Sequence, residues 1–198
     1  LLRQQTSRLD LVGIGHRVVH GGSDCDCPQR IDTSLLDRLH ALVPLAPLHL
    51  PHNLAGIVAM GAHFPGVPQL ACFDTAFHHG LPQLARHTGL PREYEAQGVR
   101  RYGFHGLSYE FIVDDLRRRH GPAALDERLI VAHLGNGASM AAIRHGRSVE
   151  TTMGFSALGG MPMGTRSGDL DPGILLYLAG HDGLDAAEIE ELLYRRSG

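Results

Sequence analysis

The stretch from Ile130 to Ser139 constrains the fold most, because an apolar run stops at a glycine–asparagine–glycine tripeptide and then resumes. Two apolar runs joined by a short glycine-rich turn are typical of a β-hairpin. Because Gly135 and Gly137 have no side chain and permit positive φ angles, we expect the backbone N–H groups of the turn to converge on an anion such as phosphate. An ordinary tight turn is the alternative reading of the same residues.

Composition excludes several classes of protein. With 198 residues, 43% of them hydrophobic, the chain can bury a core as one large domain or two small ones. A net charge of -3 argues against nucleic-acid binding, which needs a clustered basic face. The basic run Arg117-Arg118-Arg119 is explained as the solvated end of a helix. No apolar stretch reaches about 18 residues, so we expect no membrane span.

Cysteine and histidine usage indicates no disulfide scaffold or metal cluster. The three cysteines, Cys25, Cys27 and Cys72, cannot all pair, which fits a reducing, cytoplasmic environment. The fourteen histidines invite the hypothesis of a histidine-rich metal-binding protein. None of them forms a convincing helical metal motif beside an acidic partner, so we expect structural or dispersed roles for most of them.

Periodicity predicts alternating strands and helices, and therefore an α/β protein. We expect Thr33 or Ser34 to cap the helix that starts near residue 33 and Ser108 to cap the helix over 108–120. We expect Asp185 to form a capping box with Glu188 at the start of the helix over 185–195. The glycine-rich segment 151–173 has no regular pattern, but its apolar residues indicate that it is packed. The expected strands cover residues 11–20 and 67–73 and the hairpin 128–149 with a return turn at 145–146; the expected helices cover 33–43, 51–63, 108–120, 172–179 and 185–195.

Six stretches, in order, closely match the acetate kinase family of acyl-phosphate-forming kinases. They are GHRVVHGG (15–22), LAPLH (45–49), FDTAFH (73–78), RYGFHG (101–106), HLGNGAS (133–139) and TMGF through MGTRSGD (152–155 and 163–169). The resemblance covers nearly the whole chain. It implies an actin-like ATPase fold, as in sugar kinases, Hsp70 and actin, with two ribonuclease H-like domains and the active site in the cleft between them.

The resemblance also implies that the chain is the central piece of an enzyme about twice as long. Residues 1–78 would be the latter part of the N-terminal ribonuclease H-like domain, and residues 79–198 the first part of the C-terminal nucleotide-binding domain. The full-length enzyme is expected to be a homodimer. The implied reaction is ATP plus acetate giving ADP plus acetyl phosphate, with Mg²⁺ as cofactor, for which Mn²⁺ is expected to substitute.

Two arginines and a histidine match the family's catalytic residues. Arg17 and Arg166 are the matched arginine pair, and guanidinium groups suit both carboxylate and phosphoryl oxygens. His105 matches the residue that donates to the transferring phosphoryl group and stabilises the transition state. The matched ATP-binding residues are His133, Leu134, Gly135, Asn136 and Gly137.

Asp74 follows an expected strand at its carboxyl end, where α/β folds place chemistry. The resemblance implies an acid/base role for it. Acetate, with a pKa of roughly 4 to 5 by analogy with side-chain carboxyls, is already ionised at neutral pH and needs no base. We therefore expect Asp74 either to orient Arg17 or to bind Mg²⁺ through water.

The matched acyl pocket consists of Val19, Leu48 and Phe104, with His49 in a supporting or acyl-site role. The chain departs from the family at Ala157, where proline is usual, and we expect the smaller side chain to permit some turnover of propionate. It departs again at Tyr109, often histidine in the family, which we expect to touch none of the main residues.

Two other readings stay open. The chain could belong to a propionate or butyrate kinase, although Val19 favours acetate. It could also be a catalytically inactive fragment with only a partial phosphate site.

Overall fold

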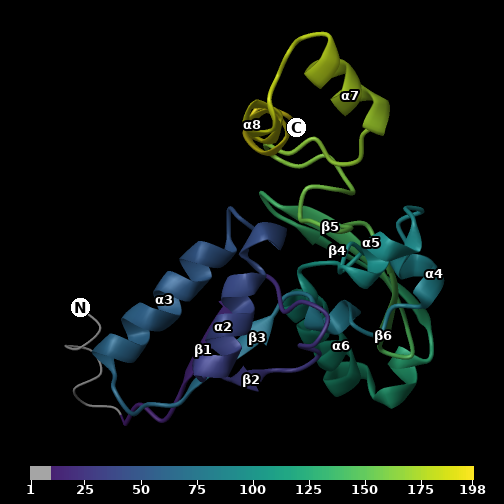
Figure 1. The fold of residues 1–198 in the computed structure, drawn as a ribbon. Helices are drawn as coiled ribbons and strands as arrows, with labels where there is room; N and C mark the ends of the chain where they lie inside the picture. Colours follow the sequence, from purple (N-terminus) through teal and green to yellow (C-terminus); the bar gives the residue numbers. More distant parts are fainter. Residues whose placement is uncertain (1–9) are drawn as a thin grey trace. The chain divides into compact units, whose positions relative to one another are not determined.

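The computed structural model describes residues 10–198, and the chain divides into two compact units (Figure 1). The first unit ends at Ala76, and the second runs from Phe77 to Gly198. The expected domain boundary lies after residue 78. The assignment of the two units to the N-terminal and C-terminal domains of a longer kinase stays a prediction.

The first unit contains a three-stranded sheet and two helices. The strand β1 (Ile14–Val18) pairs in parallel with β3 (Gln69–Phe73), and the short β2 (Gln29–Arg30) pairs antiparallel with the other edge of β3. The helices α2 (Thr33–Ala41) and α3 (Leu50–His63) lie beside this sheet (Figure 1), with the 3-10 turn η1 (Val43–Leu45) between them.

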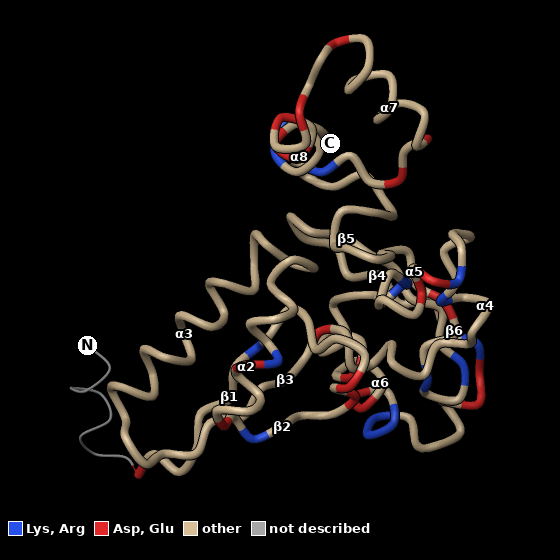
Figure 2. The backbone as a smooth tube through the Cα atoms, viewed as in Figure 1, with Lys and Arg blue, Asp and Glu red and all other residues tan. Residues whose placement is uncertain are grey.

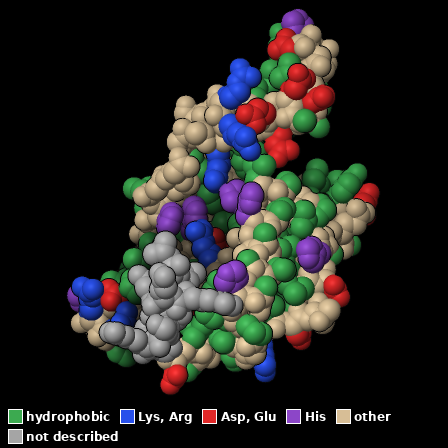
Figure 3. Space-filling model, turned by 90° about the vertical axis from the view of Figure 1, so that its left-hand side faces the viewer, with side chains coloured by type: hydrophobic (Ala, Val, Ile, Leu, Met, Phe, Trp, Pro, Cys, Tyr) green, Lys and Arg blue, Asp and Glu red, His purple; other side chains and the backbone are tan. Residues whose placement is uncertain are grey.

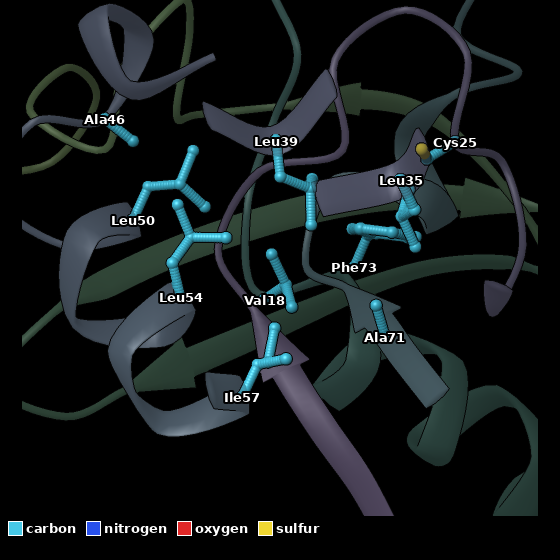
Figure 4. Close-up of a cluster of buried hydrophobic side chains, with 10 residues drawn as sticks. All are labelled: Val18, Cys25, Leu35, Leu39, Ala46, Leu50, Leu54, Ile57, Ala71 and Phe73. Atoms are coloured by element: carbon cyan, nitrogen blue, oxygen red, sulfur yellow. The ribbon is translucent and has the colours of Figure 1, made fainter. Parts of the chain in front are cut away.

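Apolar side chains from both helices meet side chains of the sheet to form the core of this unit (Figure 4). The α2 residues Leu35 and Leu39 recur at the four-residue spacing of one helix face, and both are at most 1% exposed. They pack with Val18 and Phe73, which end the two parallel strands. The core therefore anchors the carboxyl ends of β1 and β3, where Arg17 and Asp74 lie.

The N-cap of α2 is the residue before the two predicted caps. Asp32, and neither Thr33 nor Ser34, is the cap, because its carboxylate accepts a hydrogen bond of 2.8 Å from the backbone N–H of Leu35. A carboxylate in this position also interacts favourably with the helix dipole. The predicted start of α3 beside Pro51 is confirmed.

The second unit is built on an antiparallel meander of β4 (Arg128–Leu134), β5 (Ala138–Arg144) and β6 (Arg147–Thr151). The predicted hairpin and its return turn are confirmed. His145 and Gly146 both have positive φ in that turn, at 51° and 70°, as a two-residue hairpin loop requires.

The helix α6 (Gly106–His120) packs on one face of this sheet through Tyr109 and Val113, which meet Ala141 and Ile143 of β5. Its predicted cap, Ser108, is wrong. His105 holds the cap position in the left-handed conformation, with φ 61° and ψ 21°. A non-glycine residue in that conformation costs free energy, so the surrounding contacts must hold it there.

The remaining helices of the second unit are α4 (Gln83–Arg86), α5 (Arg92–Ala96), α7 (Pro172–Gly180) and α8 (Ala186–Arg195), together with the 3-10 turns η2 (Ala76–His78), at the boundary between the units, and η3 (Pro122–Leu125). The predicted capping box of α8, between Asp185 and Glu188, is confirmed.

The connection between β6 and α7 has no helix or strand, as predicted, and it is packed. Met153 is fully buried, and Met163 is 6% exposed. Backbone hydrogen bonds also hold this connection, including those from Tyr102 N to Gly154 O at 3.0 Å and from Asp169 N to Gly160 O at 2.7 Å. The segment that carries Arg166 is therefore fixed by packing.

Charged residues on α6 explain the basic run of the sequence (Figure 2). Arg117 pairs with Asp114 at 2.7 Å, and Arg119 pairs with Asp115 at 2.7 Å. The two arginine side chains are mostly exposed, so the prediction of a solvated helix end is confirmed. Within residues 10–198, no helix is both long enough and apolar enough to cross a membrane.

Candidate active site

The first group of candidate residues centres on Arg17 and Asp74. Nε of Arg17 donates to both carboxylate oxygens of Asp74 at 3.0 Å, and Nη2 donates to Oδ2 at 2.6 Å. The carboxylate is 2% exposed, whereas the guanidinium side chain is 65% exposed. A buried carboxylate therefore holds an arginine whose outer edge faces solvent.

Strand register explains why these two residues meet. Arg17 on β1 is the cross-strand partner of Cys72 on β3. Asp74 lies two residues after Cys72, so its side chain points to the same side of the sheet, and diagonal neighbours lie within reach of a long side chain. The backbone N–H of Asp74 also donates to Val18 O at 3.0 Å, which continues the pairing past the end of β3.

Asp74 also stabilises the protonated, positively charged form of Arg17. The hydrogen bonds to Asp74 do most to raise the pKa of the guanidinium, burial lowers it, and the charge of Asp74 raises it further. Nη1 of Arg17 makes no hydrogen bond to any residue within 10–198. A charged, oriented guanidinium edge of this kind suits a carboxylate or a phosphoryl group.

The second group converges on Gly137, in the loop between β4 and β5. A Cβ atom built on Gly137 would lie 3.4 Å from Nε2 of His105 and 3.5 Å from Nη1 of Arg166. Glycine leaves that space open, so two nitrogen atoms flank a position that an anion could occupy. Sequence reasoning selected all three residues, and the structure brings them together within the second unit.

Arg166 is held in place by its own loop. Its Nη1 donates to the carbonyl oxygen of Ala157 at 2.9 Å, and its carbonyl oxygen accepts from Met163 N at 2.9 Å. Burial lowers the pKa of the Arg166 guanidinium from its ordinary value. Arginine nevertheless stays protonated in proteins, so the side chain presents a partly desolvated positive charge beside Gly137.

His105 and His133 form a stacked pair whose rings are each bonded to a serine. The ring centroids lie 4.0 Å apart. Nδ1 of His105 lies 2.8 Å from Oγ of Ser139, and Nδ1 of His133 lies 3.0 Å from Oγ of Ser108. These bonds direct Nε2 of His105 toward Gly137.

Sequence reasoning missed Ser139, and with it the indirect link from Tyr109 to His105. The Tyr109 hydroxyl lies 2.5 Å from Oγ of Ser139, the same oxygen that contacts His105. Tyr109 is therefore one atom removed from a predicted catalytic residue. Ser139 lies two residues before Ala141, which packs against α6, so it faces the same helix, and strand periodicity alone could have indicated that side of the sheet.

The glycine–asparagine–glycine loop differs from its predicted conformation. Neither Gly135 nor Gly137 has a positive φ, so the expectation of a convergent nest of N–H groups built on positive φ is wrong. The three-residue loop closes with a hydrogen bond of 3.1 Å from Gly135 N to Gly137 O. Glycine serves close approach here: a Cβ on Gly135 would lie 3.4 Å from Gly137 O.

The connection before α7 covers part of this loop. Gly164 N donates to Asn136 O at 3.2 Å, and a Cβ on Gly164 would lie only 2.5 Å from Oδ1 of Asn136. His133 is half-buried, and Leu134 is 74% exposed at the end of β4. The ATP-binding roles of His133, Leu134 and Asn136 stay predictions.

The predicted acyl-pocket residues belong to both units. Val19 and Leu48 are half-buried in the first unit, and His49 is the first flanking residue of α3. In the second unit Phe104 is 2% exposed, and its carbonyl oxygen lies 3.1 Å from Nε2 of His78. Ala157 is half-buried and contributes its carbonyl oxygen to Arg166. Their role in substrate binding stays a prediction.

The described residues fit Mg²⁺ only in a limited way. Within residues 10–198, no group of three or more histidine, cysteine, aspartate or glutamate side chains is placed to hold a metal ion. Histidine side chains instead occupy several separate places on the face shown in Figure 3. Asp74 already accepts three hydrogen bonds from Arg17. Because Mg²⁺ keeps several waters and takes ligands from substrate phosphates, Asp74 can contribute through a bridging water at most.

Comparison with known proteins identifies relatives over almost the whole chain. A model of the acetokinase family matches residues 2–198. The acetate kinase of Rhodopseudomonas palustris (strain ATCC BAA-98 / CGA009) is 55% identical over 188 residues, which are 95% of this chain and 47% of that protein. The chain thus spans about half the length of the curated relatives it matches.

Solved structures share the fold. The crystal structure of Porphyromonas gingivalis acetate kinase matches with a TM-score of 0.87 and 41% identity, over 98% of this chain and 49% of that chain. A propionate kinase from Francisella tularensis subsp. tularensis SCHU S4 matches with a TM-score of 0.94 and 38% identity, over 100% of this chain and 51% of that chain. The predicted fold class, a partial actin-like ATPase fold, is confirmed.

Proposed function

Because this chain belongs to the acetokinase family, we propose that it provides the catalytic centre of a carboxylate kinase that converts ATP and acetate into ADP and acetyl phosphate. The phosphoryl group passes directly from ATP to a carboxylate oxygen of acetate. The bond between that oxygen and phosphorus forms as the bond to the leaving oxygen of ADP breaks. In-line transfer of this kind depends on positioning and on charge stabilisation, with little covalent work by the protein.

The convergence of His105 and Arg166 on Gly137 carries the proposal. An anion beside Gly137 would meet one neutral or cationic donor and one permanent positive charge. Such a pair stabilises the charge that develops on the equatorial oxygens of a transferring phosphoryl group. The absence of a side chain at position 137 leaves room for those oxygens.

Arg17 supplies the charge for the second anion of the reaction. Its outer guanidinium edge is exposed, and Asp74 fixes its orientation. We assign this edge to the carboxylate of acetate, with Val19 and Leu48 beside the methyl group. Two substrates that are both anions repel each other, and separate arginines for each reduce that repulsion.

Asp74 acts in this proposal through Arg17 and takes no proton. Acetate is ionised at neutral pH, so the nucleophile needs no base. The three hydrogen bonds between Arg17 and Asp74 favour the orienting role over the acid/base role implied by the resemblance. Mg²⁺, when bound with ATP, neutralises charge on the phosphate oxygens. We expect Mn²⁺ to substitute for it, and we expect the longer enzyme to be a homodimer.

Trapping of acetyl phosphate with hydroxylamine tests the reaction. The assay is run on the 198-residue chain and on a chimera in which the 188 matched residues of this chain replace the corresponding segment of the Rhodopseudomonas palustris acetate kinase. We expect the folded chimera to form hydroxamate only when both ATP and acetate are present. A folded chimera that forms none contradicts the proposal.

Propionate is the second candidate substrate, favoured by the match to a propionate kinase structure and by Ala157 in place of the usual proline. One methylene in an apolar pocket is worth only about 1–3 kcal/mol of discrimination. We therefore expect both acids to react, with acetate preferred because Val19 keeps the pocket short. Butyrate should react more slowly than either.

The alternative of an inactive fragment applies to the isolated chain. Hydroxamate from the chimera but not from the 198-residue chain would support it. In that case the residues described above form only part of the nucleotide site, and the remainder of the longer enzyme completes it.

A further inference from the structure

We infer that Ser139 and Tyr109 are positioning residues that hold His105 in the tautomer with its proton on Nε2. The functional consequence of this inference rests on the proposed function, whereas the tautomer itself does not. The two residues act through a chain of hydrogen bonds that ends at Nδ1 of His105, on the side of the ring away from Gly137.

The hydroxyl of Ser139 has two partners and a single proton. Its Oγ lies 2.8 Å from Nδ1 of His105 and 2.5 Å from the hydroxyl of Tyr109. The Ser139 side chain is fully buried, so a proton without an acceptor would cost about 1–3 kcal/mol. The serine therefore donates to one partner and accepts from the other.

Tyr109 decides the direction. Burial raises the pKa of its hydroxyl above the ordinary value, and the hydrogen bond with Ser139 acts in the opposite direction. The phenol thus stays protonated at neutral pH. The Tyr109 side chain is fully buried, and its hydroxyl lies against Oγ of Ser139, so the phenol proton points to that oxygen.

Ser139 must then donate its own proton to Nδ1 of His105. A ring nitrogen that accepts a hydrogen bond carries no proton, so the neutral imidazole carries its proton on Nε2. Nε2 is the atom 3.4 Å from the position of a Cβ on Gly137. The chain of bonds from Tyr109 through Ser139 thus points an N–H donor at the place proposed for the phosphoryl group.

This arrangement gives Tyr109 a role that histidine could not fill in the same way. A neutral histidine at position 109 could present either an N–H or a bare nitrogen to Ser139, so the direction of the hydrogen bonds would not be fixed. The phenol has one proton and one orientation toward Oγ. The substitution of tyrosine at this position therefore fixes the tautomer of His105 more strictly.

Long-range ¹H–¹⁵N correlation spectra of the histidine side chains test the inference on the 198-residue chain, without ATP or acetate. The His105 signals are assigned by their loss in His105→Gln. At a pH where the ring is neutral, we expect Nδ1 to show the shift of an unprotonated nitrogen and Nε2 that of a protonated one. A His105 ring protonated on Nδ1 overturns the inference.

Variants distinguish a specific effect of the Ser139 hydroxyl on the His105 tautomer from a general disturbance of the fold. Ser139→Ala should change the tautomer ratio of His105 by at least threefold, and Ser139→Thr, which keeps the hydroxyl, should restore it. Ser108→Ala is the matched control, because it removes the serine bonded to His133 and should leave the His105 ratio unchanged. An unchanged ratio in a folded Ser139→Ala variant overturns the inference.

Kinetics of the chimera give the functional readout. Ser139→Ala should lower kcat about threefold to tenfold, with little change in the KM for acetate, because one hydrogen bond to the catalytic ring is lost. If the chimera makes no acetyl phosphate but the spectra show the Nε2–H tautomer, the proposed function fails and the tautomer inference stands.

Discussion

The rings of His105 and His133 lie face to face, with centroids 4.0 Å apart and planes 22° apart. Each ring forms a hydrogen bond that crosses between the helix and the hairpin. His105, at the start of α6, bonds Ser139 of β5, and His133 of β4 bonds Ser108 of α6. This crossed pairing joins the helix to the hairpin. It makes a fixed wall of two rings beside Gly137.

Gly137→Ala tests whether the space beside that wall holds a ligand. The added methyl group would lie 3.4 Å from Nε2 of His105, which is a tolerable contact, and Gly137 has no positive φ. We expect thermal stability to stay level or rise slightly, since alanine reduces the entropy of the unfolded chain. The kcat/KM of the chimera for ATP should fall at least tenfold.

Gly135→Ala is the matched control in the same loop, because its methyl group would approach Gly137 O and neither nitrogen. Its effect on kcat/KM should be several-fold smaller. Equal losses for the two variants, measured by steady-state kinetics, would contradict the placement of the phosphoryl group beside Gly137.

A double-mutant cycle on Arg17 and Asp74 tests the orienting role of the carboxylate. Asp74→Asn should raise the KM for acetate and lower kcat/KM about tenfold to a hundredfold, because the guanidinium loses its charged partner. In an Arg17→Ala background the same change should have little effect, which corresponds to a coupling energy of about 1–3 kcal/mol.

Two outcomes would contradict this role. A shifted pH–rate profile in Asp74→Asn indicates acid/base catalysis instead. Recovery of the lost rate at higher Mg²⁺ or with Mn²⁺ indicates that the main role of the carboxylate is at the metal.

His78 makes stability depend on pH. The ring is 1% exposed, lies 2.8 Å from Ser148 Oγ through Nδ1, and contacts Phe104 O through Nε2. Burial lowers its pKa to about 4 in the folded protein, from 6.5, while the bond to Phe104 acts weakly in the opposite direction. The unfolded chain therefore binds the proton more tightly, and stability is lost as the pH falls from 6.5 toward 4.

The size of this effect follows from the gap between the two pKa values. It corresponds to about 3 kcal/mol of unfolding free energy over that range. Denaturant unfolding of the 198-residue chain at several pH values measures it. His78→Gln, which cannot titrate, should be less stable at pH 7 but show a flatter dependence between pH 6.5 and 4. An equally steep dependence in the variant would assign the effect to other groups.

Ala157→Pro tests the origin of substrate preference. Proline restores the usual family residue and adds volume, while it keeps the carbonyl oxygen that accepts from Arg166. The ratio of kcat/KM for propionate to that for acetate should fall about threefold or more in the chimera. No detectable propionate turnover before the change would refute the role assigned to Ala157.

Much of the fold could be predicted because long periodic segments determine it. The apolar run before Asp74 predicted a strand, and the pairing of that strand with β1 brings Asp74 to Arg17. Helix caps were harder, because Asp32, Thr33 and Ser34 are all good caps and the sequence pattern does not distinguish them.

The contacts around His105 could not be read from the sequence. A left-handed histidine at a helix start is rare, and no local pattern indicates it. Ser139 is a small residue in a strand whose importance comes from a helix 30 positions away in the chain, through Tyr109. The glycines at 135 and 137 were identified correctly, but for the wrong reason, since they provide close approach and not positive φ.

The proposed reaction is tested most directly by the amount of acetyl hydroxamate that the chimera forms from ATP, acetate and hydroxylamine, compared with the same chimera carrying Arg166→Ala. We expect one hydroxamate for each ADP released, and a loss of at least a hundredfold in the variant. Hydroxamate formation that is absent in the folded chimera, or undiminished by Arg166→Ala, would contradict it.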